Sequence, residues 1–204
     1  MNWLAHTLLS KNNTEYQLGN LLADPMKGRP WTDASAHLRQ GMLMHKAIDR
    51  FTDGHALLSV SKARLGTDGH LKGVVLDLLF DHFLSIRWSS YGAVDLPSYL
   101  QRFHDRSVQL AGTFPAKPQR IINRLAETEL LAQYQTFAGF VMALQRIDQR
   151  LSARARQRET ASQYLPVVEQ QHDALLADFD AFFPQLVNHF KQHQLGSKTE
   201  HWLV

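Results

Sequence analysis

The segment that most constrains the fold is residues 72–88, which is apolar around most of its circumference on a helix and yet contains two aspartates. A helix of this composition is typical of the centre of a helical protein, because it leaves no face for water. Asp77 and Asp81 are four residues apart and therefore share one face. An ionised carboxylate that is buried without a partner costs several kcal/mol. The aspartate pair therefore calls for a specific explanation.

A second polar stripe lies in the preceding helical segment, residues 34–51. His45, Asp49 and Asp53 recur every four residues and so line one face there. Because both polar stripes lie on otherwise apolar helices, we expect the two stripes to face each other and to bind one divalent cation together. Carboxylate and imidazole ligands suit Mn²⁺, Mg²⁺, Fe²⁺ or Zn²⁺, and a carboxylate-rich set favours Mn²⁺ or Mg²⁺. The alternative is that each carboxylate pairs with Arg or Lys from a neighbouring helix.

Three further side chains are candidates for catalysis. Asp24 precedes a proline, which disfavours the helical conformation and indicates a helix end, where a carboxylate can bind metal or act as a general base. It can equally be a turn aspartate bonded to its own backbone. His6 lies among apolar residues and is either a structural core histidine or a catalytic one. His82 follows Asp81 and is rotated by about 100° around the helix, so it would border the same site at a different angle.

The remaining pattern is helical nearly throughout, and no alternating run of β-branched residues predicts a strand. We therefore expect one all-α domain, a helical bundle over residues 1–195, followed by a polar tail at 196–204. Thr32 or Asp33 is the expected N-cap of the second helix, and Pro184 is expected to kink or break the last one. The predicted helices are 34–51, 72–88, 97–111, 118–132, 134–156 and 162–193.

Several functional classes are excluded or disfavoured by composition and motif. The chain has no cysteine, which excludes disulfides, thiolate nucleophiles and Cys-type zinc sites. It has no Gly-x-Ser-x-Gly elbow and no glycine-rich phosphate loop. No apolar run approaches the roughly 20 residues of a membrane span, and no signal peptide is evident at the start. We expect a cytoplasmic protein.

The net charge of +3 is unevenly distributed. Residues 101–158 contain ten Lys or Arg against four Asp or Glu. Aromatic residues are not interleaved with these arginines as they are in many single-strand nucleic-acid sites. An acidic helical protein is therefore the expected partner, with a solvated helix face as the alternative. The arginines expected to bind it are spaced by four in each local group: Arg102, Arg106, Arg120, Arg124, Arg146 and Arg150.

Several separated motifs, in this order, resemble those of the acyl carrier protein phosphodiesterases. They are Met1-Asn2-Trp3-Leu4-Ala5-His6, Gly19-Asn20-Leu21-Leu22-Ala23-Asp24, residues 41–53 with His45, Ile48, Asp49, Thr52 and Asp53, and residues 76–84 with Trp88. The resemblance is densest in the first ninety residues. The position after His45 is commonly arginine in that family and is Lys46 here, which removes a bidentate phosphate clamp at that point.

The resemblance implies a mostly helical, rearranged relative of the metal-dependent His-Asp phosphohydrolases. Its implied activity is hydrolysis of the phosphodiester that joins 4′-phosphopantetheine to a serine of holo-acyl carrier protein, with Mn²⁺ preferred and Mg²⁺ or Fe²⁺ as alternatives. The alternatives in function are a phosphohydrolase acting on a nucleotide or another phosphodiester, and a non-catalytic helical module that binds an acidic partner. The resemblance implies roles at or near the metal for Asp24, His45, Asp77, Asp81 and His82, with His6 as a further candidate. Together with Asp49 from the second polar stripe, the expected metal ligands are Asp24, His45, Asp49, Asp77 and Asp81, and the expected catalytic residues are Asp24, His82 and His6.

Overall fold

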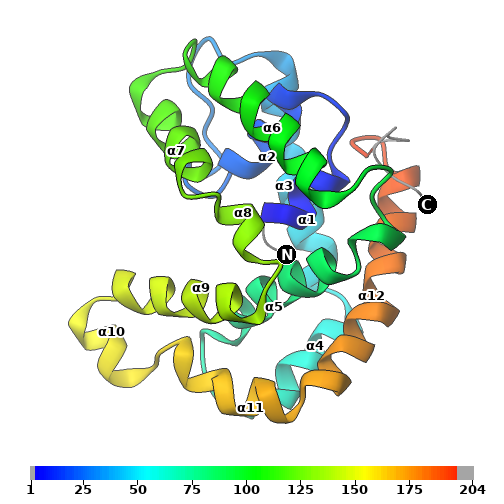
Figure 1. Ribbon diagram of the computed structural model, residues 1–204, viewed down its shortest axis with the longest axis vertical. Helices are drawn as coiled ribbons and strands as arrows, with labels where there is room; N and C mark the ends of the chain where they lie inside the picture. The colour runs from blue at the N-terminus through cyan, green and yellow to red at the C-terminus, as the bar shows by residue number, and fades with distance from the viewer. Residues whose placement is uncertain (1–2, 197–204) are drawn as a thin grey trace.

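The computed structural model describes residues 3–196, which form a single all-α domain with no β-strand among them (Figure 1). The predicted fold class is confirmed. The predicted polar tail, apart from Gly196, lies outside the described residues. None of the described helices has the length and apolar character that spanning a membrane would require.

The chain forms a succession of helices with short connections. In chain order these are α1 (Trp3–Leu9), α2 (Thr14–Leu22), α3 (Ala36–Asp53), α4 (Ala56–Arg64), α5 (Lys72–Ile86), α6 (Leu96–Ala111), α7 (Ala116–Glu127), α8 (Leu130–Gln133), α9 (Phe137–Arg150), α10 (Ala153–Arg158), α11 (Leu165–Gln170) and α12 (His172–Gln192), with 3₁₀ turns at Trp88–Ser90 (η1) and Ser162–Tyr164 (η2).

Helix α5 lies at the centre of the domain, as its apolar composition predicts, and contacts α1, α4, α9 and α12 (Figure 1). Its Phe80 ring meets Phe179 of α12 edge to face, with 5.3 Å between ring centroids. Phe179 in turn stacks on Phe183 one turn further along α12. The predicted helix at 72–88 thus ends two residues early, and its burial supplies much of the hydrophobic stabilisation of the domain.

Helices α2 and α3 approach each other so closely that only glycine fits at two points of contact. A Cβ on Gly19 would lie 2.1 Å from the Leu38 carbonyl oxygen, and a Cβ on Gly41 would lie 2.0 Å from the Tyr16 carbonyl oxygen. Side chains larger than hydrogen would therefore force the two backbones apart. This close packing brings the end of α2 beside the middle of α3.

The C-terminal end of the helix predicted at 134–156 is wrong because polar side chains interrupt the helix. Helix 134–156 ends at Arg150, and a new helix starts after Ser152, whose hydroxyl caps the Ala155 N–H at 3.2 Å. Asp148 accepts hydrogen bonds from the backbone N–H groups of Ala161 and Ser162, at 2.5 and 3.2 Å. These bonds fold the following segment back toward α9, so the chain cannot continue as one helix.

Other boundaries differ in smaller ways. Ser35 is the N-cap of α3, rather than Thr32 or Asp33, because its hydroxyl accepts the Leu38 N–H at 3.1 Å. The predicted helix at 118–132 starts at Ala116 and divides at Glu129, which has a left-handed backbone. The predicted helix at 162–193 consists of η2, α11 and α12. Helix α12 continues through Pro184 to Gln192, so the proline does not end it.

Candidate metal centre

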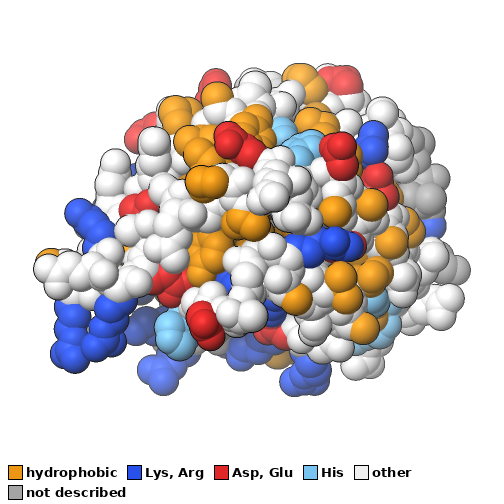
Figure 2. All heavy atoms as spheres, turned by 90° about the horizontal axis from the view of Figure 1, so that it is seen from below, with side chains coloured by type: hydrophobic (Ala, Val, Ile, Leu, Met, Phe, Trp, Pro, Cys, Tyr) orange, Lys and Arg blue, Asp and Glu red, His pale blue; other side chains and the backbone are white. Residues whose placement is uncertain are grey.

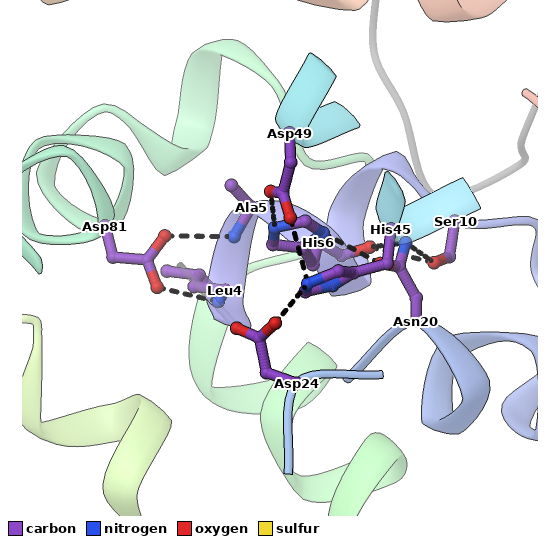
Figure 3. A network of polar contacts seen from close by, with 9 residues as sticks. All are labelled: Leu4, Ala5, His6, Ser10, Asn20, Asp24, His45, Asp49 and Asp81. Carbon is purple, nitrogen blue, oxygen red and sulfur yellow. Dashed lines mark hydrogen bonds and ion pairs between the residues drawn. The ribbon is translucent and has the colours of Figure 1, made fainter. Parts of the chain in front are cut away.

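The short helix α1 is fixed in place by a carboxylate from the central helix. Asp81 of α5 is completely buried and accepts hydrogen bonds from the backbone N–H groups of Leu4 and Ala5, at 2.8 and 3.1 Å (Figure 3). Those N–H groups are at the start of α1, where no carbonyl within the helix is available to them. Burial raises the pKa of Asp81 to about 7, although both N–H donors act in the opposite direction. Asp81 therefore anchors the helix that carries His6.

The imidazole of His6 is oriented by Asn20 of α2. His6 Nδ1 lies 2.7 Å from Asn20 Oδ1, while the Asn20 amide nitrogen donates to the His6 carbonyl at 3.0 Å and to the Ser10 hydroxyl at 2.9 Å. Because the Asn20 oxygen can only accept, the His6 proton must be on Nδ1. When His6 is neutral, its Nε2 therefore presents a lone pair.

That lone pair is directed into a cluster formed with α3. His6 Nε2 lies 3.4 Å from Asp49 Oδ1, and His45 Nε2 lies 3.1 Å from Asp49 Oδ2 (Figure 3). The two imidazole rings stack with 4.2 Å between their centroids. Within residues 3–196, His6, His45 and Asp49 are the group whose potential ligand atoms all lie within 4.8 Å of one another.

Asp24 completes the cluster on its solvent side. Its Oδ1 lies 3.0 Å from His45 Nε2, and its side chain is 74% exposed. The two histidines are almost fully buried, whereas the Asp49 side chain is 39% exposed. The cluster is thus open to solvent along the side formed by its two carboxylates.

The charges in the cluster depend on one another. Burial lowers the pKa of His6, and the Asp49 hydrogen bond only partly offsets it. Burial would also lower the pKa of His45, but Asp24 and Asp49 outweigh it and raise that pKa to about 9. Burial acts to raise the pKa of Asp49, but its contacts with His45 and His6 outweigh burial and hold that pKa well below its ordinary range, and His45 likewise lowers the pKa of Asp24. Both carboxylates are therefore ionised at neutral pH.

This donor set fits a divalent cation. A neutral His6 places a nitrogen lone pair and a carboxylate oxygen 3.4 Å apart, and two acceptors so close need a proton or a cation between them. Two carboxylates and two imidazoles match the charge and ligand preference of Mn²⁺, Mg²⁺, Fe²⁺ or Zn²⁺. The Asn20–His6 hydrogen bond is the kind of outer contact that orients a metal-binding histidine.

The structure thus brings together Asp24, His45 and Asp49, three of the predicted metal ligands, and places beside them His6, which the sequence predicts as a catalytic residue near the metal. Asn20 was not recognised as a site residue at all, although it lies in the Gly19–Asp24 motif. His6 lies on α1 and Asn20 on α2, and the chain between these two helices is not helical, so helical periodicity does not relate the two residues.

The remaining predicted residues lie elsewhere. Asp53 pairs with Lys62 at 3.7 Å, and both oxygens of Asp81 accept backbone N–H groups of α1. His82 Nδ1 bonds to the Tyr134 carbonyl at 2.7 Å. Asp77 is half-buried and, like Asp81 and His82, is not part of the three-residue group. The roles of Asp77 and Asp81 as metal ligands, and of His82 in catalysis, stay predictions.

The predicted partner-binding arginines occupy two separate regions. Arg102 and Arg106 of α6 line a hollow of about 300 Å³ together with Gln17 and Tyr99. Arg124 of α7 and the α9 pair Arg146 and Arg150 line another hollow, of about 270 Å³. Arg120 is exposed on α7. Their role in binding a partner stays a prediction.

Comparison with known proteins identifies similar sequences over nearly the whole chain. The sequence model described as acyl carrier protein phosphodiesterase matches residues 1–186. Proteins named acyl carrier protein phosphodiesterase are 30% identical in Klebsiella pneumoniae subsp. pneumoniae, covering 96% of this chain and 100% of the relative, and 30% identical in Photorhabdus laumondii, covering 91% and 90%. A third, from Yersinia enterocolitica, is 27% identical over 96% of this chain and 100% of its own. No solved structure matches the chain.

Proposed function

Because the chain belongs to the acyl carrier protein phosphodiesterase family, we propose that it hydrolyses the phosphodiester between 4′-phosphopantetheine and a serine of holo-acyl carrier protein. The products are apo-acyl carrier protein and 4′-phosphopantetheine. The observation that supports this most strongly is the convergence of His6, His45 and Asp49 on one point, with Asp24 at its solvent side. Phosphodiester hydrolysis needs such a site, because negative charge develops on the phosphate oxygens.

We assign the metal to the Nε2 atoms of His6 and His45 and to the carboxylate of Asp49. Mn²⁺ is the proposed ion, with Mg²⁺ or Fe²⁺ as alternatives, since imidazole and carboxylate ligands suit all three. Such an ion would neutralise charge on the phosphate and lower the pKa of a nearby water. Asn20 holds His6 in the tautomer that leaves Nε2 available.

Asp24 is the proposed general base. It is the most exposed member of the cluster, it is ionised at neutral pH, and its Oδ1 already lies 3.0 Å from His45 Nε2. With the ion on His45 Nε2, the Asp24 carboxylate would be released from its contact with that nitrogen and could accept a proton from an attacking water. Asp49, which is less exposed than Asp24, would hold the ion together with the two imidazoles.

Asp81 has a positioning role in this account. Its two hydrogen bonds to the N–H groups of Leu4 and Ala5 fix the first turn of α1, and His6 is the next residue in that helix. These bonds keep His6 in position, and a misplacement of about 1 Å in a site can cost about a hundredfold in rate.

The proposed substrate is an acidic protein, and the arginine-bearing helices supply complementary charge. Seen from below, Lys and Arg side chains gather at the edge where α10 lies, at the left of Figure 2. Helix α10 itself contributes Arg154, Arg156 and Arg158. Charge of this kind chiefly raises the association rate of an acidic partner. Carrier proteins of fatty acid synthesis in the cytoplasm are the proposed partners, and nucleic acid is not expected.

The proposed function is tested by mass spectrometry of holo-acyl carrier protein after incubation with the purified protein and Mn²⁺. The carrier protein should lose the mass of 4′-phosphopantetheine, while cyclic nucleotides and a generic bis-aryl phosphodiester should be turned over far more slowly. Faster turnover of the nucleotides would favour the alternative phosphohydrolase. Binding of carrier protein without any mass loss would favour a non-catalytic module.

A further inference from the structure

A groove begins beside the metal centre and has three arginines along its walls. Two hollows, of about 270 and 80 Å³, share Trp3, Leu130, Arg146 and Arg150 as walls and are therefore neighbours. The larger is close to the lower end of the range for small-ligand sites, about 300–1,000 Å³. Pro25 lines it and directly follows Asp24 in the chain. The groove thus starts one residue from the proposed general base.

The charge of this groove is unbalanced. Arg124, Arg146 and Arg150 line the larger hollow, and neither hollow is lined by Asp or Glu. Within residues 3–196 the ion pairs that do form with arginine involve Arg64 and Arg87, on other parts of the surface. A cavity with several guanidinium groups and no carboxylate attracts an anion.

Arg146 provides a second, independent observation. Its Nη1 donates to the Gln133 side-chain oxygen at 2.6 Å, which fixes the direction of the guanidinium. Its Nη2 is buried and, in the part of the chain that the structure describes, has no hydrogen-bond partner. A buried donor without an acceptor is costly, and more so on a charged group. The missing partner is best supplied by an anionic oxygen in the groove.

The rest of the wall is apolar. Trp3, Ile121, Leu125 and Leu130 face the larger hollow alongside the arginines. A ligand that fits both features has an anionic head with an apolar group close to it. The phosphate of 4′-phosphopantetheine and the gem-dimethyl group next to it have this chemistry.

From these observations we infer that the groove is a subsite for the phosphopantetheine moiety, in which Arg146 binds a phosphate oxygen and the wall formed by Trp3, Ile121 and Leu130 contacts the gem-dimethyl group of the pantetheine arm. The identity of the ligand rests on the proposed function. Arg146 is thus assigned to binding of substrate and product, and Gln133 holds its guanidinium in place. The neighbouring arginines can contact the carrier protein itself as well.

The test is titration calorimetry of the full-length protein, in Mn²⁺, with 4′-phosphopantetheine, pantetheine and inorganic phosphate. Arg146→Gln should weaken 4′-phosphopantetheine binding at least tenfold. Arg102→Gln, which removes the same charge from the other hollow, should change it less than twofold. Equal effects of the two variants, or none from Arg146→Gln, would overturn the inference. Arg146→Gln also removes the Nη1 bond to Gln133, so thermal unfolding of the variant is measured beside its binding. Arg150→Gln, which removes a charge from the same groove, should also weaken 4′-phosphopantetheine binding, and wild-type affinity in that variant would count against the inference.

A second pair of variants tests the arm. Ile121→Ala should weaken binding of 4′-phosphopantetheine while leaving inorganic phosphate unchanged. Val108→Ala, at a residue that is 45% exposed on α6, should affect neither ligand. If 4′-phosphopantetheine binds no more tightly than inorganic phosphate, the assignment of the arm is wrong. These binding results do not depend on turnover: a protein that binds 4′-phosphopantetheine through Arg146 without cleaving holo-acyl carrier protein would refute the proposed function and leave the groove assigned.

Discussion

His6 and His45 come from separate helices, stack with 4.2 Å between their ring centroids, and both direct Nε2 at the carboxylate of Asp49. Two buried imidazoles in parallel would repel each other if both were protonated, and the pKa of His6 is lowered by burial and, to a smaller extent, by the charge of His45. The cluster is therefore stable with one cation held between the ring nitrogens and the carboxylates. A divalent metal ion is the cation that we propose.

Asp49→Asn should remove the metal and the activity together. The amide keeps the size of the side chain but loses the charge that holds both histidines and the proposed ion. We expect Mn²⁺ content below a tenth of the wild-type value and hydrolysis of holo-acyl carrier protein reduced at least a hundredfold. Asp53→Asn is the matched control, since Asp53 is one turn further along α3 and makes only a long contact with Lys62. Metal retention in the Asp49 variant would contradict its assignment as a ligand.

Asn20→Ala should weaken metal binding through His6. The variant removes the acceptor that fixes the His6 proton on Nδ1, and loss of such an outer contact typically costs 10–100-fold in metal affinity. Competition with a fluorescent chelator measures this change. Ser10→Ala is the control: it removes one Asn20 bond and one bond to the His6 carbonyl but leaves His6 Nδ1 paired. Its metal affinity should stay within twofold of wild type, and a larger drop would show that Asn20 has no special role.

Asp81→Asn should lower stability while the metal remains bound. An amide can accept only one of the two backbone N–H groups of α1, and an unsatisfied buried donor costs about 1–3 kcal/mol. Urea unfolding monitored by circular dichroism gives the stability, and plasma mass spectrometry gives the metal content. The opposite result, wild-type stability with lost Mn²⁺, would restore Asp81 as a metal ligand.

His82 should lower the free energy of unfolding at acidic pH. Burial lowers the pKa of His82 despite its bond to the Tyr134 carbonyl. The folded state therefore binds this proton more weakly than the unfolded chain, whose histidine pKa is about 6.5. Above pH 6.5, His82 should not change the free energy of unfolding. As the pH decreases below that value, the free energy of unfolding should decrease by up to about 1.4 kcal/mol per pH unit. Urea midpoints at pH 7.5 and 5.5 should differ less in His82→Asn than in wild type, and an equal difference would exclude this contribution.

The sequence is sufficient to predict the parts of the site that depend on helical spacing. His45 and Asp49 are one turn apart on α3, and their shared face follows from the periodicity alone. Asp24 was predicted at a helix end because a proline follows it. These inferences need only local geometry, which is why they agree with the structure.

The missed features depend on contacts between distant segments. Asp77 and Asp81 do share a helix face, but the partner of Asp81 is the backbone of α1. Every residue except proline has a backbone N–H group, so the sequence cannot indicate which of these groups a carboxylate will bind. The expectation that two carboxylate stripes face each other therefore overlooked α1, which contacts both α2 and α5. The break between α9 and α10 arises likewise from Asp148, whose bonds to Ala161 and Ser162 cross ten intervening residues or more.

The most direct test of the metal centre is the anomalous difference density of a crystal grown with Mn²⁺. We predict one strong peak in contact with His6 Nε2, His45 Nε2 and the Asp49 carboxylate, with metal–ligand distances of about 2.0–2.3 Å. A peak beside Asp77 and Asp81 instead, with the stacked histidines left without metal, would contradict the account.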